Sequence, residues 1–151
     1  MSNIILPLAL IGMVLGGTLS ALQAKDPGKG KTQNQMQITI GQKTFKATLE
    51  DNVTAAAFKA MLPLKLNMDD VNDNEKVSGL SANLPTEDSN PKHIQTGDLM
   101  IWASRSLVLF YKSFPTSYSY TRLGRIHDPA GLFAAVGSGN VTVTFKLEPE
   151  R

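Results

Sequence analysis

Apolar and polar residues alternate with a period of two in two neighbouring stretches of the chain. In residues 36–40 a Met and two Ile share one face, and in residues 45–49 a Phe, an Ala and a Leu do so. Side chains of a β-strand point alternately to its two faces, so this period indicates strands with one buried face. A short Gly-led turn, residues 41–43, separates the two stretches. The pattern therefore predicts a β-hairpin.

Residues 51–62 follow a helical pattern, with apolar positions three and four residues apart. Asp51 or Asn52 can accept a hydrogen bond from the first helical turn, and Pro63 cannot continue a helix. A short helix is therefore predicted here. Its expected apolar face consists of Val53, Ala57, Phe58, Met61 and Leu62.

A second short helix is predicted in HDPAGLFAAVG, residues 127–137. Asp128 is expected to cap this helix, Pro129 suits its first position, and Gly137 suits a left-handed exit. The residues expected to face inward are Leu132, Phe133 and Val136.

Two stretches of the second half, residues 99–103 and 107–111, are almost continuously apolar. Strands of this kind are covered on both faces, so these two are expected at the centre of a sheet. The polar residues Ser104, Arg105 and Ser106 lie between them. The other stretches that predict strands are residues 63–68, 117–126 and 141–147.

Regular patterns are missing from residues 69–97, which hold many of the acidic residues and two Pro. A long irregular stretch of this kind is commonly functional or mobile. Leu80 and Leu84 are expected to fix it to the core, and short strands that the pattern does not place are expected within it.

The expected elements form a mainly β, mostly antiparallel domain of seven or eight strands with two short helices. Such a sheet is expected to close into a barrel, because closure removes the exposed edge strands that otherwise promote aggregation. The domain is expected to span residues 36–151, after a polar linker at residues 25–35.

Residues 1–24 contain no charged side chain and run through an apolar stretch to small residues. This composition predicts a signal peptide that directs export to the periplasm or cell envelope of a bacterium. An uncleaved membrane anchor remains an alternative, since the run is about long enough to span a bilayer. Membrane contact is expected only through this segment, if it stays uncleaved.

Composition excludes several kinds of site. The chain has no Cys, which excludes disulfides, thiolate zinc sites and a Cys nucleophile. Its formal charge is only +2 and its Lys and Arg are dispersed, so nucleic acid is not an expected partner. No cofactor is expected, because neither a phosphate-binding loop nor a dinucleotide fingerprint is present.

A metal site is not expected either. Asp70, Asn72 and Asn74 have the spacing that opens a calcium loop, but Glu75 stands where such a loop needs Gly. This stretch is therefore interpreted as a solvated polar turn. The two His of the chain lie far apart in the sequence and have no ligand-like spacing.

The best candidate binding surface is aromatic. On a strand over residues 117–126, the side chains of Tyr118, Tyr120 and Arg122 would share one face. Two Tyr and one Arg could stack on a flat ligand and bind its carboxylate, with Phe114 and Trp102 as further wall residues. The alternative is an ordinary strand rich in Tyr and Thr, with Arg122 paired to a neighbouring acid.

Several segments together resemble the cyclophilin-like fold proteins of bacteria, over most of residues 36–147. They are GDLMIW, LVLFYKSF, SYSYTRLGRI followed by DPAGL, the closing VTVTF, and the loop NDNEK. The resemblance implies a closed eight-stranded barrel capped by two helices.

True cyclophilins are peptidyl-prolyl isomerases, in which an Arg weakens the resonance behind a barrier of about 18–20 kcal/mol. The sequence marks of that site are missing here: residues 69–97 contain neither Arg nor Phe, and the sole Trp is Trp102. The first hypothesis is therefore an exported binding module for a peptide segment or small-molecule ligand. The alternatives are a divergent prolyl isomerase of the cell envelope and a purely structural domain on an N-terminal anchor.

Overall fold

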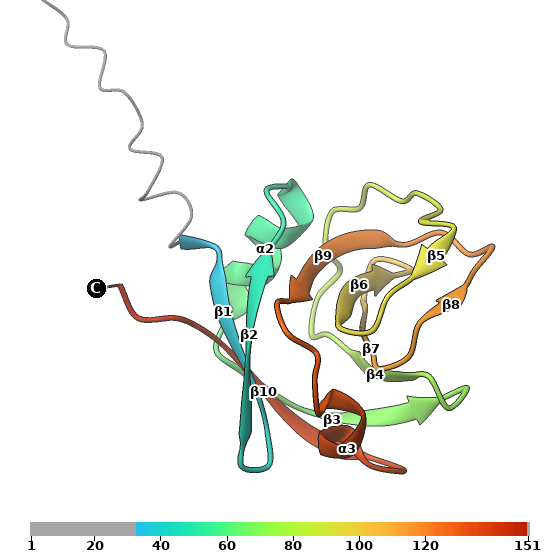
Figure 1. Cartoon of the computed structure of the whole chain (residues 1–151). Helices are drawn as coiled ribbons and strands as arrows, with labels where there is room; N and C mark the ends of the chain where they lie inside the picture. Colours follow the sequence, from blue (N-terminus) through green and yellow to red (C-terminus); the bar gives the residue numbers. More distant parts are fainter. Residues whose placement is uncertain (1–32, 151) are drawn as a thin grey trace, which may run out of the picture.

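The structure is a computed structural model, and it describes residues 33–150. Eight strands form a closed antiparallel barrel in the order β1-β10-β3-β4-β7-β6-β9-β2, and β5 and β8 form a separate two-stranded sheet (Figure 1). The predicted mainly β barrel with two short helices is therefore confirmed. The elements are β1 (Gln35–Ile40), β2 (Lys43–Leu49), α2 (Val53–Met61), β3 (Leu64–Val71), β4 (Glu75–Gly79), β5 (His93–Ile94), β6 (Asp98–Trp102), β7 (Ser106–Phe110), β8 (Phe114–Pro115), β9 (Thr121–Ile126), α3 (Leu132–Val136) and β10 (Val141–Leu147).

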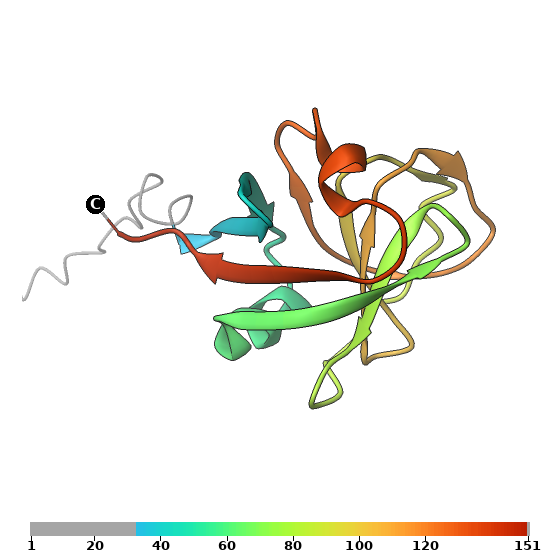
Figure 2. The same cartoon turned by 90° about the horizontal axis from the view of Figure 1, so that it is seen from below.

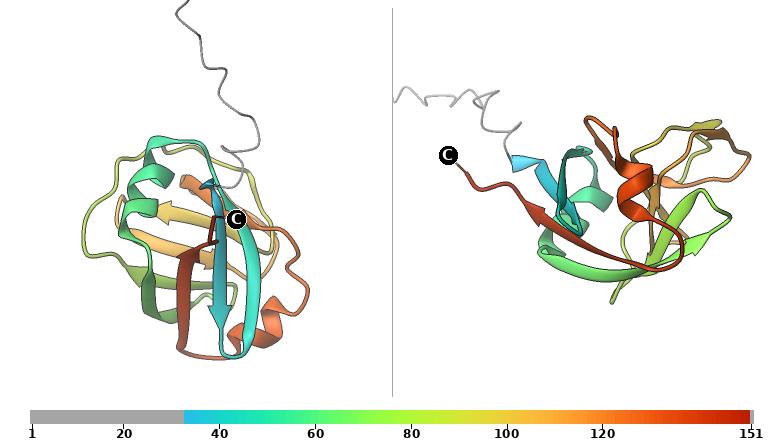
Figure 3. Two further views of the ribbon diagram at one scale, coloured as in Figure 1. Left: turned by 90° about the vertical axis from the view of Figure 1, so that its left-hand side faces the viewer. Right: turned by 60° about the horizontal axis from the view of Figure 1, so that its bottom comes forward.

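The barrel closes at β1, which lies between β2 and β10 (Figure 3, left). Ile38 pairs with Phe45 of the predicted hairpin on one side and with Phe145 of the last strand on the other. Strand β10 continues the ring by pairing with β3, and Figure 2 shows these two long strands side by side. The first and last strands of the barrel are thus direct neighbours.

The interior of the barrel is apolar and is closed at one end by α2. Phe58 of this helix packs edge-on against Phe145, with 6.2 Å between ring centroids. Asn52 caps the helix, because its side chain accepts a hydrogen bond of 2.7 Å from the Ala55 amide. Leu80 and Leu84 are both buried in the main core, as the sequence predicted.

Three details of the helices differ from the prediction. The buried residues of α2 are Thr54, Ala55 and Phe58, so the predicted apolar residue Val53 is turned outward and is exposed. Helix α3 begins only at Leu132, since Gly131 has a φ of 81° that interrupts the expected start; Asp128 accepts from the Ala130 amide instead. Phe133 is exposed because successive residues of a helix are rotated by about 100°, and Leu132 and Val136 hold the inner face.

The irregular stretch predicted over residues 69–97 includes the end of β3 and all of β4 and β5. The strand expected over residues 117–126 is shorter, because β9 begins at Thr121. Residues 1–24, predicted to be an export signal or anchor, and most of the predicted linker lie outside the described residues. Within residues 33–150 no helix is both long and apolar enough to cross a membrane.

The contact between β2 and β9 needs a residue without a side chain. Gly124 pairs with Leu49, and a Cβ atom at this position would lie 2.5 Å from the Thr48 carbonyl oxygen. Backbone atoms of a paired strand cannot move aside cheaply. We therefore expect Gly124→Ala to lower the free energy of unfolding by about 1–3 kcal/mol, as measured by urea denaturation.

Gly79→Ala is the matched control, because a Cβ atom at Gly79 of β4 meets no atom within 4 Å. It should leave stability unchanged or raise it by less than about 1 kcal/mol. Equal stability of the two variants would show that β2 and β9 do not need this close approach.

Candidate functional site

Strands β6 and β7 are buried on both faces, and only one of these faces belongs to the interior of the barrel. Leu99, Ile101, Leu107 and Leu109 are part of the main core. The residues between them point to the opposite side of the wall. There they form a second group, here called the outer cluster, which consists of Ile94, Met100, Val108, Phe110 and Tyr120.

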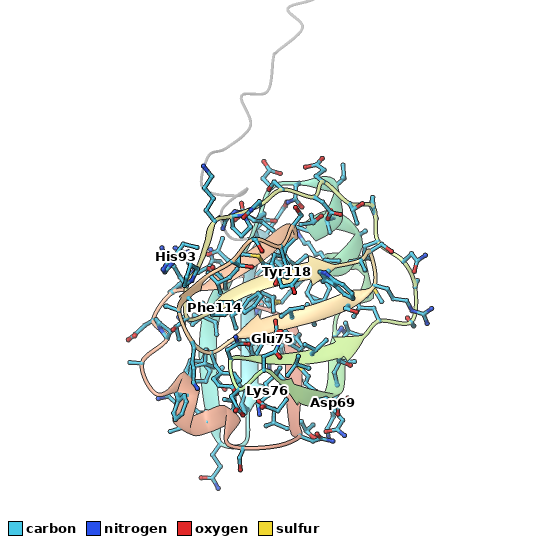
Figure 4. The ribbon with its side chains drawn as sticks, turned by 90° about the vertical axis from the view of Figure 1, so that its right-hand side faces the viewer. Asp69, Glu75, Lys76, His93, Phe114 and Tyr118 are labelled. Atoms are coloured by element: carbon cyan, nitrogen blue, oxygen red, sulfur yellow. The ribbon has the colours of Figure 1, made fainter. Side chains whose placement is uncertain are left out.

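A cavity of about 340 Å³ lies beside the outer cluster, on the outer face of strands β4, β7 and β6. Backbone pairing aligns Val77 with Val108, and Ser106 with Trp102, across these strands. Figure 4 views this face of the molecule, with Tyr118, Phe114 and Glu75 labelled. The cavity is lined by three aromatic residues, Trp102, Tyr118 and Tyr120; three valines, Val71, Val77 and Val108; and three polar residues, Asn72, Glu75 and Ser106.

The structure brings three of the five predicted site residues to this cavity. Tyr120 is buried at its inner side, where its ring packs edge-on against Phe110 at 5.5 Å. Trp102 and Tyr118 are 51% and 67% exposed, so their rings remain largely open to solvent. These three residues thus line one cavity, and ligand binding by them stays a prediction.

The other two predicted residues do not line the cavity. Phe114 packs against Phe110, with 5.7 Å between ring centroids, at the edge of the outer cluster. Arg122 is exposed on β9, where it pairs with Met100 of β6. The predicted common face of a single strand is corrected here: Tyr118 precedes β9, and Tyr120 forms an isolated bridge with Ser89.

Glu75 is the main site residue that the sequence interpretation missed. The sequence shows Glu75 only as the residue that breaks a calcium-loop spacing, and its pattern does not place β4. In β4 it pairs with Phe110 and alternates with Lys76, so the two neighbouring charges lie on opposite faces of the wall. An alternating apolar pattern over residues 75–79 would have indicated this strand. Val77 is the only large apolar residue in this stretch, so the pattern is missing.

Glu75 is half-buried in the cavity. Burial raises the pKa of its carboxyl group, a hydrogen bond with Asn72 lowers it, and the negative charge of Asp70 raises it again. The pKa of Tyr120 is raised as well, first by burial and then by the charge of Glu75. Among residues 33–150 no Lys, Arg or His forms an ion pair with Glu75.

A second polar cluster lies at the other side of β4, around Lys76. The Lys76 ammonium is fully buried and contacts Asp70 Oδ1 at 2.8 Å, while it donates to the carbonyl oxygens of Gly137 and Gly139 at 3.0 and 2.6 Å. Tyr111 donates its hydroxyl proton to the same Asp70 oxygen at 2.6 Å. All three ammonium protons have acceptors, so the cluster fixes the loop after α3 to the barrel.

The pKa of Tyr111 is raised, first by burial and then by its hydrogen bond to Asp70, so the phenol stays protonated. Residues 33–150 contain no group of three or more His, Asp or Glu that could hold a metal ion. Asn72 and Asp73, with φ of 54° and 52°, form the polar turn between β3 and β4.

Comparisons with known proteins identify a family and a similar fold. A model of the cyclophilin-like family matches residues 38–146. Among solved structures, the solution structure of the hypothetical protein AF2241 from Archaeoglobus fulgidus is similar, with a TM-score of 0.53 and 17% identity. The likeness covers 78% of this chain and 97% of that one, and at this identity it concerns the fold. No curated protein matches the chain.

The Asp70–Lys76 pair predicts a pH dependence of stability. Hydrogen bonds from Lys76 and Tyr111 hold the pKa of Asp70 below its ordinary value of 3.8. The stability that Asp70 contributes is therefore complete above that pH and is lost as the pH falls through the lower, folded-state pKa. We expect Asp70→Asn to lower the melting temperature at neutral pH and to lose less stability than the parent protein on acidification.

Asp69→Asn is the control, because Asp69 is an exposed neighbour on the same strand. The melting temperature of the Asp69→Asn variant should follow that of the parent protein from neutral pH down to about pH 2. An Asp70→Asn profile parallel to that of the parent would contradict the assigned role of the pair.

Proposed function

Because the chain belongs to the cyclophilin-like family and has an aromatic cavity on the outer face of its barrel, we propose that it binds a peptide segment or small ligand there. The observation that supports this proposal most strongly is that Trp102, Tyr118 and Tyr120 line one cavity of about 340 Å³. Ligand pockets commonly measure about 300–1,000 Å³ and combine apolar walls with few polar groups. Covering the exposed rings of Trp102 and Tyr118 would favour a complex.

Binding has more support than prolyl isomerisation. An isomerase site in the manner of cyclophilins needs a guanidinium that donates to the prolyl nitrogen. The described residues that line the cavity include no Arg, and Arg122 lies outside it. The proposal is therefore a binding module without a catalytic step.

The proposal includes the site of action. The uncharged, apolar residues 1–24 have the composition of an export signal, so the module would work in the periplasm or cell envelope of a bacterium. Fractionation of cells, with mass spectrometry of the N-terminus, tests this part. Recovery of the protein in the cytoplasm alone would contradict it.

Binding can be followed by fluorescence, since Trp102 is the sole Trp of the chain and lines the cavity. We expect members of a library of tripeptides and neutral, cationic and anionic fragments to change its emission. Tyr118→Ala should weaken the binding of such hits at least about tenfold, with little change in melting temperature, because the ring is mostly exposed.

Phe133→Ala is the matched control. Phe133 is a similarly exposed aromatic residue, 61%, and it lies outside the cavity. Its removal should leave the affinities unchanged. The proposal fails if no library member alters Trp102 emission, or if the two variants weaken binding equally.

A further inference from the structure

The cavity combines three aromatic rings with one negative charge. Glu75 is the only acid among the described residues that line it, and no Lys, Arg or His accompanies it. The described polar partner of Glu75 is the neutral side chain of Asn72. The cavity therefore carries a net negative charge, although the chain as a whole has a formal charge of +2.

Three aromatic rings elsewhere in the described part of the chain have a Lys ammonium beside them. Lys43 lies 5.2 Å from the Phe45 ring centroid, Lys76 lies 5.3 Å from that of Tyr111, and Lys112 lies 5.6 Å from that of Phe133. Such a cation is attracted by the negative face of the ring. Among residues 33–150 no Lys or Arg takes this position over Trp102, Tyr118 or Tyr120.

We propose that the cavity selects ligands that carry an ammonium group, which pairs with the Glu75 carboxylate and lies against the rings of Trp102 and Tyr118. This inference rests on the proposed binding function and adds the chemical class of the ligand. The group can belong to a Lys side chain of a peptide or to a small amine, since both present the same chemistry to the cavity.

The position of Glu75 distinguishes this ligand from the other classes. A purely apolar ligand would bury the carboxylate further without a charged partner, which costs free energy. An anionic ligand would be repelled by it. An ammonium group restores the charge balance of the cavity, and the raised pKa of Glu75 agrees with a carboxylate that lacks a cation.

The experiment compares charged probes with uncharged probes of the same shape. Choline is paired with the alcohol in which a carbon atom replaces its quaternary nitrogen. Nα-acetyl-lysine methylamide is paired with the Nα-acetyl methylamide of 2-aminoheptanoic acid, in which a methyl group replaces the ammonium group. Binding is measured by calorimetry and by Trp102 fluorescence. At least one charged probe should bind about tenfold or more tightly than its neutral counterpart, and the pair that shows the preference distinguishes a small amine from a peptide side chain.

Two acid-to-amide variants show whether Glu75 causes the preference. Glu75→Gln keeps the size and polarity of the side chain and should reduce the difference between charged and neutral probes several-fold, to the part that the rings supply. Glu50→Gln, an exposed acid outside the cavity, should retain it. Tyr118→Leu should weaken choline binding more than binding of the neutral alcohol, because the aliphatic side chain has no negative face.

The outcomes separate this inference from the proposal on which it rests. Equal affinity for charged and neutral probes, or a preference that is undiminished in Glu75→Gln, overturns the ammonium assignment. If only neutral library members bind at Trp102, the assignment fails and the binding function stands. If nothing binds at Trp102, both fail.

Discussion

Strands β6 and β7 are apolar on both faces, and the rest of the site depends on this constraint. One face of each strand fills the barrel with Leu and Ile, and the other presents Met100, Val108 and Phe110 to the outside. Apolar side chains on an outer wall have to be covered, because exposing them to water costs free energy. The small β5–β8 sheet and the segment that leads to Tyr120 supply that cover. The cavity is the part of this wall that the cover leaves open.

Strand β4 shows how one wall carries two different polar environments. Glu75 and Lys76 are adjacent in sequence, and the alternation of the strand sends their charges to opposite sides. Lys76 is fully buried with Asp70 and two carbonyl oxygens, so its charge is satisfied within the chain. Glu75 faces the cavity, where its described contact is with neutral Asn72. The anchored Lys76 holds the strand in place, and the half-buried Glu75 gives the cavity its charge.

The sequence predicts most of the barrel because its strands have clear patterns. Alternation identifies β1, β2 and β10, and the continuous apolar runs identify β6 and β7 as central strands. Strand β4 escapes prediction because Val77 is its only large apolar residue, and its buried Lys76 is satisfied in part by carbonyl oxygens at residues 137–139, far away in sequence. The early start predicted for α3 fails for a local reason, since the left-handed Gly131 separates Asp128 and Pro129 from the helix.

The candidate site is harder to predict than the fold. Tyr118 and Tyr120 attract attention as aromatic residues among Ser and Thr, and the structure places both at the cavity together with Trp102. The grouping of Arg122 with the two Tyr depends on a strand that the chain does not form before Thr121, and Phe114 is expected only as a further wall residue. Glu75 reaches the same cavity only because β4 pairs with β7 in the closed barrel. A pattern within one segment cannot reveal a neighbour supplied by another.

The cavity therefore depends on closure of the barrel as a whole. Its walls come from three separate segments, residues 71–77, 102–108 and 118–120, and only the third is near β9 in sequence. The same backbone pairs that align Val77 with Val108 on the outside align the Leu and Ile side chains on the inside. A change of register in this wall would move every second side chain to the other face. Core packing and cavity geometry are consequently two results of one set of strand pairings.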